Sequence, residues 1–358
     1  MPACAACAAP AALACGACAA PYCSPACQRA AWPAHKAACR AAAAARAAAA
    51  AVAAQANVIA GELTVCSHCA ASFAGRAFHE CVQCRTVAYC DAACQRAAWG
   101  EHKSVCMAVG EAKFAVEMAD AEAGDAEAMF NVGVLYERGT GVGANAHAAV
   151  KWYTRAAEAG NATAQLNLGV CYEKGAGVAV DARVAIKWFT RAAEAGHEVA
   201  QFNLGLCYEH GKGVAADARA AVKWYTRAAE AGYAKAQFKL GFFYANGTGS
   251  VADFRAAVKW YTRAAEAGHA IAQYNLGVCY EQGTGVAADA RVAVKWYTRS
   301  AEAGDEHAQH NLGLCYANGT GVARDFAAAR TWWMRAAAAG HAEAPGNLAK
   351  LDALEAAP

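Results

Sequence analysis

Residues 161–196 read NATAQLNLGVCYEKGAGVAVDARVAIKWFTRAAEAG, and this stretch decides the fold. Ala164, Leu168 and Tyr172 follow one another at intervals of four residues, so they share one face of a helix. The spacing therefore predicts an amphipathic helix over about residues 162–174.

A turn and a second helix follow within the same stretch. Gly175 and Gly177 interrupt the helical pattern, and glycine is the residue that most often follows a helix C-terminus. Asp181 has a side chain that can cap the first turn of a new helix, and Gly196 provides the next stop. We expect a helix–turn–helix unit whose second helix extends from Asp181 to Gly196.

Neither helix can bury its apolar face alone. Gly169 lets a neighbouring helix approach the first helix closely. The second helix offers Ala185, Trp188, Ala192 and Ala193, and two helices this small cannot enclose a tryptophan. Stacking such units on one another would bury a continuous core, with a stability that adds up over neighbouring units.

The same pattern recurs six times with a period of 36 residues between Asp125 and Gly340. The units are 125–160, 161–196, 197–232, 233–268, 269–304 and 305–340. Residues 107–124 and 341–358 repeat parts of the unit and are predicted to be the cap helices that shield the terminal cores. The predicted fold class is mainly α: a right-handed α-solenoid of six helix–turn–helix repeats.

Two series of eight cysteine and histidine residues precede the repeats. The first series is Cys4, Cys7, Cys15, Cys18, Cys23, Cys27, His35 and Cys39, and the second is Cys66, Cys69, Cys81, Cys84, Cys90, Cys94, His102 and Cys106. From the fifth residue onward both read C-x3-C-x7-H-x3-C. Eight ligands of this kind suit two tetrahedral zinc ions per module, so we expect four Zn²⁺ in total, or two if the first module has degenerated.

A disulfide framework is the alternative interpretation of the same cysteines. It needs an oxidising compartment, and residues 1–40 show no basic start followed by an apolar stretch. The paired C-x2-C motifs and the embedded histidines favour metal. We therefore expect a reducing compartment, cytoplasmic by default and open to the nucleus as well, rather than secretion.

Composition narrows the classes of partner. The net charge of +2 gives no overall field that would select nucleic acid or a membrane surface, and no apolar run is long enough to span a bilayer. Residues 41–65 begin with a nearly pure alanine stretch and are predicted to be a linker. Four cysteines lie outside the two series at one register of the repeat and are either small buried hydrophobic residues or redox sensors: Cys171, Cys207, Cys279 and Cys315.

The repeat unit A-x3-L-G-x2-Y-x2-G-x-G-V-x2-D-x3-A-x2-W-x3-A-A-x2-G resembles the Sel1-like repeat, a relative of the tetratricopeptide repeat. The resemblance covers residues 125–340 and implies a superhelix whose first helices line the concave surface. One register of those helices holds Asn131, Asn167, Asn203, Lys239, Asn275 and Asn311. These side chains are predicted either to bind the backbone of an extended peptide or to bond neighbouring helices.

The two cysteine and histidine series resemble the MYND finger, over residues 1–40 and 66–106. Tyr22 and Tyr89 match the aromatic residue before the fifth ligand, and the Q-x3-W-x2-H-K pattern is matched by Gln28, Trp32, His35, Lys36 and by Gln95, Trp99, His102, Lys103. The resemblance implies a cross-brace of interleaved ligands. The implied sets are Cys4, Cys7, Cys23, Cys27 with Cys15, Cys18, His35, Cys39, and Cys66, Cys69, Cys90, Cys94 with Cys81, Cys84, His102, Cys106.

The MYND resemblance also implies binding of short proline-rich peptides. A flat tryptophan accepts a preformed extended proline segment at low entropic cost. Gln95 and Trp99 are the first candidates and Gln28 and Trp32 the second, unless both tryptophans serve only as core anchors. The loops of the first finger are mostly alanine, so it is either a working finger or a degenerate copy that binds metal without a partner.

The sequence is compatible with three functional classes to different degrees. A non-catalytic adaptor is favoured, with the fingers binding one class of peptide and the solenoid a second protein. A methyltransferase-type enzyme or its accessory subunit is disfavoured, because no catalytic constellation or glycine-rich cofactor loop lies outside the zinc ligands. A nucleic-acid-associated regulator is third, since the fingers carry few unbalanced cations. We expect no small-molecule substrate and no membrane partner.

Overall fold

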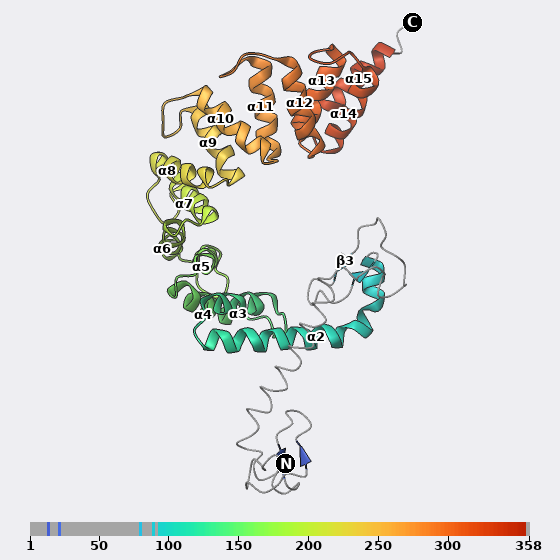
Figure 1. Cartoon of the computed structure of the whole chain (residues 1–358). Coiled ribbons are helices and arrows are strands. Elements are labelled where there is room, and N and C mark those ends of the chain that lie inside the picture. The colour runs from blue at the N-terminus through green and yellow to red at the C-terminus, as the bar shows by residue number, and fades with distance from the viewer. Residues whose placement is uncertain (1–12, 15–20, 23–78, 81–87, 90–91, 356–358) are drawn as a thin grey trace. The chain divides into compact units, whose positions relative to one another are not determined.

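The computed structural model describes residues 13–14, 21–22, 79–80, 88–89 and 92–355, and this part of the chain is almost entirely helical (Figure 1). The chain forms two compact units, residues 1–164 with 175–179, and residues 165–174 with 180–358. In the first unit, β1 (Leu13–Ala14) pairs antiparallel with β2 (Pro21–Tyr22), and β3 (His79–Glu80) pairs antiparallel with β4 (Ala88–Tyr89).

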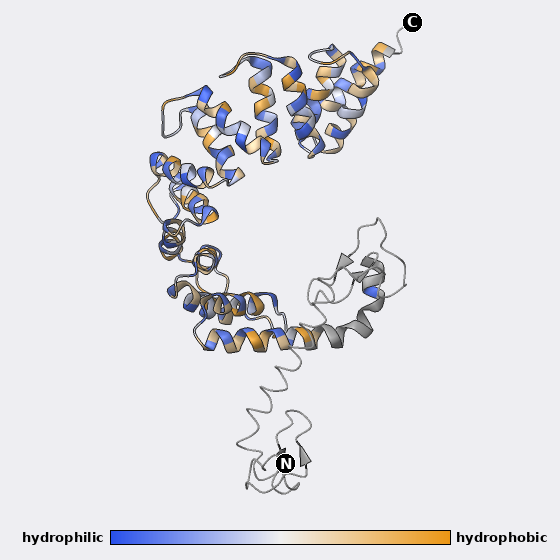
Figure 2. Cartoon of the chain, in the orientation of Figure 1, coloured by the Kyte–Doolittle hydropathy of each residue, from blue (hydrophilic) through white to orange (hydrophobic). Residues whose placement is uncertain are grey.

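Fourteen helices follow in the described residues, α2 (Ala92–Glu122) first and α15 (Ala344–Glu355) last. Between them lie α3 (Ala126–Arg138), α4 (Ala146–Glu158), α5 (Ala162–Lys174), α6 (Ala182–Glu194), α7 (Glu198–His210), α8 (Ala218–Glu230), α9 (Ala234–Asn246), α10 (Phe254–Glu266), α11 (Ala270–Gln282), α12 (Ala290–Glu302), α13 (Glu306–Asn318) and α14 (Phe326–Ala338). The six predicted helix pairs are confirmed, and the fold is an α-solenoid. Figure 2 shows that hydrophobic and hydrophilic residues share every repeat helix.

Helix boundaries follow the predicted capping chemistry. The Asp181 carboxylate accepts hydrogen bonds from the backbone amides of Arg183 and Val184 at 2.9 and 3.0 Å, so Asp181 is the N-cap of α6. Gly175 and Gly177 both have a φ of 75°, in the left-handed region that glycine tolerates best. The helix itself ends at Glu194, two residues before Gly196, where the backbone turns at a φ of 92°.

The repeat core is built around the aromatic residue that follows each tryptophan. Phe189 is 1% exposed, whereas its neighbour Trp188 is only half-buried. A Cβ on Gly169 would lie 2.5 Å from the Phe189 ring, so the glycine lets this ring lie flat against α5. The predicted close approach at Gly169 is confirmed, but the sequence reasoning gave the central core position to Trp188 instead of Phe189.

The tryptophans contact the neighbouring repeat. Trp224 of α8 packs against the cluster around Phe189 of α6, and Trp260 of α10 packs against the cluster around Tyr225 of α8. Within the second unit, each repeat therefore completes the core of the one before it. This arrangement agrees with the prediction that a single unit cannot stand alone.

The helix α2 is longer than the predicted cap. It spans 31 residues, so the end of the second finger and the predicted cap at 107–124 share one continuous helix. Ala112 and Ala121 are buried on the cap half of this helix, and the ring of Phe114 meets Tyr136 of α3 edge-on at 5.3 Å. The first repeat is thus covered by a helix that begins inside a zinc finger.

Candidate functional site

The predicted zinc ligands lie mostly outside the described residues. Three of the sixteen, Cys94, His102 and Cys106, lie on the described backbone of α2, and their side chains are outside the described part. The same holds for the predicted peptide-binding residues Gln95 and Trp99, while Gln28 and Trp32 fall wholly outside it. The structure therefore places the last third of the second finger on a helix and leaves ligand geometry undescribed.

The two fingers share one local topology. In each, a two-residue antiparallel pair brackets the second C-x2-C motif: β1 and β2 flank residues 15–20, and β3 and β4 flank residues 81–87. The fifth ligand, Cys23 or Cys90, comes directly after the second strand. The third candidate ligand, Cys15 or Cys81, comes directly after the first strand, so the third and fifth candidate ligands follow opposite ends of each hairpin.

The donor chemistry of these residues fits zinc. Thiolate sulfur and imidazole nitrogen are the ligands of structural Zn²⁺ sites, and the eight candidate ligands of each finger are all of these two types. Among the side chains that the structure describes, no group of three or more His, Cys, Asp or Glu is placed to hold a metal ion. The candidate metal ligands therefore remain those of the fingers.

The asparagine register of the solenoid has partners inside the protein. Asn131, Asn167, Asn203, Lys239, Asn275 and Asn311 are all half-buried. The Asn131 amide donates to the Glu117 carboxylate of α2 at 3.1 Å. Lys239 Nζ lies 2.9 and 3.2 Å from the two carboxylate oxygens of Glu209 in the preceding repeat. The register thus bonds neighbouring helices and keeps part of its surface in solvent.

A tyrosine of the second helix completes this polar network. The Tyr225 hydroxyl donates to Glu209, and the Tyr297 hydroxyl donates to Glu281 at 2.8 Å. Burial, together with the Glu209 carboxylate, raises the pKa of Tyr225 far above its ordinary value. Burial also acts to raise the pKa of Glu209, but hydrogen bonds from Tyr225 and Lys239 outweigh it and hold that pKa below its ordinary value.

The fourth repeat lacks this carboxylate, because Ala245 stands where Glu209 and Glu281 stand in the neighbouring repeats. Burial raises the pKa of Tyr261 to about 12, and a hydrogen bond with Asn275 opposes that rise. Asn311 similarly opposes the rise at Tyr297. The asparagine of the register, Asn275 or Asn311, therefore interacts with the tyrosine of the preceding repeat.

A row of buried glutamines was missed by the sequence reasoning. Gln201, Gln237, Gln273 and Gln309 are each 7% exposed. Their amides donate to backbone carbonyls near the end of the preceding helix, at 3.0 to 3.1 Å. Each of these carbonyls also accepts from the backbone amide of the glycine three residues later, as Ala193 does from Gly196 at 3.1 Å, so the glutamine adds a second hydrogen bond at the helix end. The signal was present, since glutamine occupies this position in five of the six units.

Each repeat also carries an arginine stacked on its tryptophan. The guanidinium carbon lies between 4.3 and 4.8 Å from the ring centroid in all six repeats. The pairs are Arg155 with Trp152, Arg191 with Trp188, Arg227 with Trp224, Arg263 with Trp260, Arg299 with Trp296 and Arg335 with Trp332. Cation–π stacking of this kind orders the arginine side chain on the surface.

The repeat cysteines behave as small hydrophobic residues. Cys171, Cys207 and Cys315 are buried, and Cys279 is half-buried. Burial raises the pKa of Cys207 and of Cys315 to about 11, so their thiols stay protonated at neutral pH. A reactive cysteine needs a lowered pKa and access to solvent. The interpretation as core residues is favoured over redox sensing.

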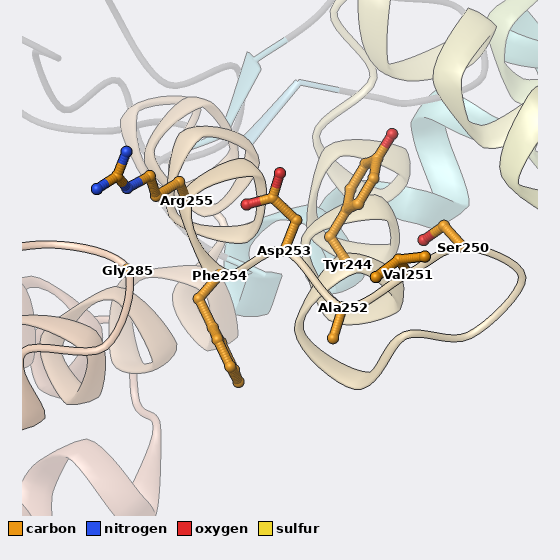
Figure 3. A pocket seen from close by; sticks show the side chains of 8 residues that line it. All are labelled: Tyr244, Ser250, Val251, Ala252, Asp253, Phe254, Arg255 and Gly285. Carbon is orange, nitrogen blue, oxygen red and sulfur yellow. The ribbon is translucent and has the colours of Figure 1, made fainter.

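Two surface depressions mark departures from the repeat. One, of about 630 Å³, lies at the turn between α9 and α10, beside Tyr244, Val251 and Phe254 (Figure 3). The other, of about 650 Å³, lies between α13 and α15, where the rings of His310 and His341 stack at 4.1 Å. The first also contains Ser250 and Asp253, but the Ser250 hydroxyl has no hydrogen-bond partner among the described residues, so no base there activates it.

Family models match most of the chain. The Sel1 repeat matches residues 126–161, 162–197, 199–233, 234–269, 270–305 and 306–341. The MYND finger matches residues 4–39 and 66–106. No curated protein matches the chain. Within the described residues, no helix is both long and apolar enough to cross a membrane.

Two solved structures share the fold and part of the sequence. A protective antigen of uropathogenic Escherichia coli with an SLR fold is 35% identical with a TM-score of 0.64, over 66% of this chain and 50% of the antigen. The chain thus aligns with half the length of that protein. A Sel1 repeat protein of Oxalobacter formigenes is 35% identical with a TM-score of 0.55, over 67% of this chain and 95% of its own. This chain belongs to the Sel1 repeat family, and two MYND zinc fingers precede its repeats.

Proposed function

We propose that the protein is a non-catalytic adaptor, in which the fingers bind one partner and the solenoid binds another. The observation that carries this proposal is the row of stacked helix pairs in the second unit, which offers a surface without a recognisable reaction centre among the described residues. Solenoids of stacked repeats are built to present such surfaces. The membership of the Sel1 and MYND families supports an interaction role.

The proposed division of labour assigns proline-rich peptides to the fingers, through Gln95 and Trp99 and secondarily Gln28 and Trp32. The solenoid takes a second polypeptide along the asparagine register. Half-buried amides such as Asn203 keep part of their hydrogen-bonding capacity for a peptide backbone. Each finger holds two Zn²⁺, and the protein works in a reducing compartment, the cytoplasm and also the nucleus, because the metal-binding thiols must stay reduced.

A displayed peptide library tests this proposal with the zinc-loaded full chain in reducing buffer. Trp99→Ala and Asn203→Ala serve as paired variants. Proline-containing peptides that are lost only in Trp99→Ala would assign recognition to the finger. Peptides that are lost only in Asn203→Ala would assign it to the solenoid register. If the wild-type protein enriches no peptide, the adaptor proposal is wrong.

A further inference from the structure

The second helices of the repeats carry a row of cations that the proposed peptide sites do not use. On α8 these are Arg219, Lys223 and Arg227, at intervals of four residues and all exposed. The same three positions hold arginine, lysine and arginine in α6, α10 and α12. Since four residues rise by about 6 Å along a helix, each helix presents three cations in a line.

These four helices belong to one compact unit, and their cations are unpaired. All twelve side chains are exposed, and within the described part of the chain none of them forms a salt bridge with a carboxylate. Other cations of the same unit do find acids, as Lys212 does with Glu173 at 3.5 Å and Lys239 with Glu209 at 2.9 Å. We call these twelve side chains the cationic face.

The last cation of each row is held in place. Arg191, Arg227, Arg263 and Arg299 stack on the tryptophan three residues earlier, at 4.7 to 4.8 Å from the ring centroid. A guanidinium that lies flat on a ring keeps its N–H edge free for a bidentate carboxylate. Because the ring already restricts the side chain, binding an anion costs less entropy than it would at a free arginine.

The surroundings favour a polypeptide over nucleic acid. Each row ends in an exposed glutamate, Glu230 in α8, which would repel a continuous phosphate backbone. Each of the four helices carries a net charge of +2, and the whole chain also carries only +2. Acidic residues elsewhere therefore cancel most of the positive charge, and the protein has no strong long-range field that would attract nucleic acid. Beside the third row, Phe254 is 47% exposed and points away from Arg255 (Figure 3), which offers an apolar contact as well.

We infer that the cationic face binds an extended acidic segment of a partner protein. The inference rests on the proposed role of the solenoid as a binding scaffold, and it names the chemistry of one partner. The four rows lie on alternate helices, with α7, α9 and α11 packed between them, so successive rows are separated by up to two helix-packing distances of roughly 8–10 Å each. An extended chain advances about 3.3 Å per residue, so a segment that crosses the rows would meet a new row at about every fifth residue. The matching ligand carries aspartate or glutamate with that period.

Fluorescence anisotropy on the zinc-loaded full chain tests this inference. The probe is a labelled peptide of roughly 18 residues with glutamate at about every fifth position and serine and glycine between. A peptide of the same composition with all its glutamates consecutive is the comparison. We expect saturable binding of the spaced peptide that weakens as salt rises, and weaker binding of the clustered peptide.

The stripe variant combines Arg191→Gln, Arg227→Gln, Arg263→Gln and Arg299→Gln. We expect it to lose at least roughly tenfold in affinity for the spaced peptide, because four charge-assisted bonds disappear. The matched control replaces four exposed cations of the same unit that lie off the face: Lys174→Gln, Lys235→Gln, Arg324→Gln and Lys350→Gln. The control is expected to bind like the wild type. Circular dichroism checks that both variants keep their helices.

Several outcomes would overturn the inference. Equal binding by the stripe and control variants would show that the face is not involved. A DNA duplex that binds more tightly than the peptide, and is lost in the stripe variant, would make the face a nucleic-acid site. Self-association in sedimentation that only the stripe variant abolishes would make the occupant a second copy. Binding lost in Asn203→Ala but kept in the stripe variant would move the peptide to the register, which leaves the adaptor proposal standing.

Discussion

The zinc fingers and the solenoid are stabilised by different interactions. In the fingers, eight candidate cysteine and histidine ligands lie within about forty residues that offer few large apolar side chains, so we expect metal binding to supply much of the folding free energy. In the solenoid, buried rings such as Phe189 and Tyr225 pack against glycines of the paired helix, and tryptophans pack against the next repeat. The first region should therefore respond to metal and the second to changes in side-chain volume.

Removal of zinc is the largest expected perturbation. Structural zinc contributes roughly 10–16 kcal/mol in small fingers, so chelation should unfold both modules. The fourteen cysteines of the two series would then react with a thiol reagent, while Cys207 and Cys315, buried and with a raised pKa, would stay unreactive until the solenoid unfolds. Counting reactive thiols before and after chelation measures this. Rapid reaction of all 18 cysteines on chelation would show that the solenoid depends on the metal.

Crowding at a packed glycine is the next largest effect. A Cβ on Gly205 would lie 2.5 Å from the Tyr225 ring, whereas one on Gly143 would meet nothing within 4 Å. We expect Gly205→Ala to lower the free energy of unfolding by about 1–3 kcal/mol and Gly143→Ala to leave it nearly unchanged. Urea unfolding followed by circular dichroism compares the two variants. Equal midpoints would contradict the close packing of α7 against α8.

Loss of a buried tyrosine hydroxyl should lower the free energy of unfolding by a smaller amount than crowding at a glycine. Tyr225→Phe removes the hydrogen bond to the Glu209 carboxylate, and we expect it to cost about 1–2 kcal/mol in free energy of unfolding. Tyr261→Phe is the comparison, because Ala245 stands where the carboxylate would be and the Tyr261 hydroxyl has a neutral partner, Asn275, instead. Phe189 shows that a phenylalanine ring fits the site. If both variants lose the same free energy of unfolding, the Tyr225–Glu209 bond is worth no more than the neutral bond between Tyr261 and Asn275.

The smallest effect is the pH dependence of the Glu209 site. The folded pKa of Glu209 lies below its ordinary value of 4.5, so the ionised form is favoured in the folded protein. Its contribution is fully present above about pH 4.5 and is lost as the pH falls through the lowered folded pKa. Glu209→Gln should therefore lower the urea midpoint at neutral pH and reduce its dependence on pH below 4.5. If the urea midpoint of Glu209→Gln falls below pH 4.5 as steeply as that of the wild type, Glu209 does not contribute to the acid sensitivity of the fold.

Much of the fold followed from the sequence, because local chemistry determines it. The period, the Asp181 cap, the turn at Gly175 and Gly177 and the close approach at Gly169 all depend on residues within one unit, and the structure confirms them. Which of Trp188 and Phe189 occupies the centre of the core depends on which side of the helix faces its partner helix. The two aromatic residues are adjacent in the sequence, so the apolar pattern predicts either one equally well.

The candidate sites were less predictable. The pairing of Lys239 with Glu209 joins residues thirty positions apart, and the role of Gln201 depends on a carbonyl in another helix. The cationic face was visible in the repeated K-W-Y-T-R pattern, but its lack of salt bridges within the described residues needed three-dimensional placement. The zinc ligands were read from spacing alone, and their geometry lies outside the described residues.

Hydrogen–deuterium exchange of the zinc-loaded and zinc-free full chain tests most directly whether metal holds the fingers and neighbouring repeats hold the solenoid. The account predicts that chelation strips protection from residues 4–39 and 66–106, including the first part of α2, and leaves α6 to α14 unchanged. Loss of protection throughout α6 to α14, or unchanged protection in both fingers, would contradict it.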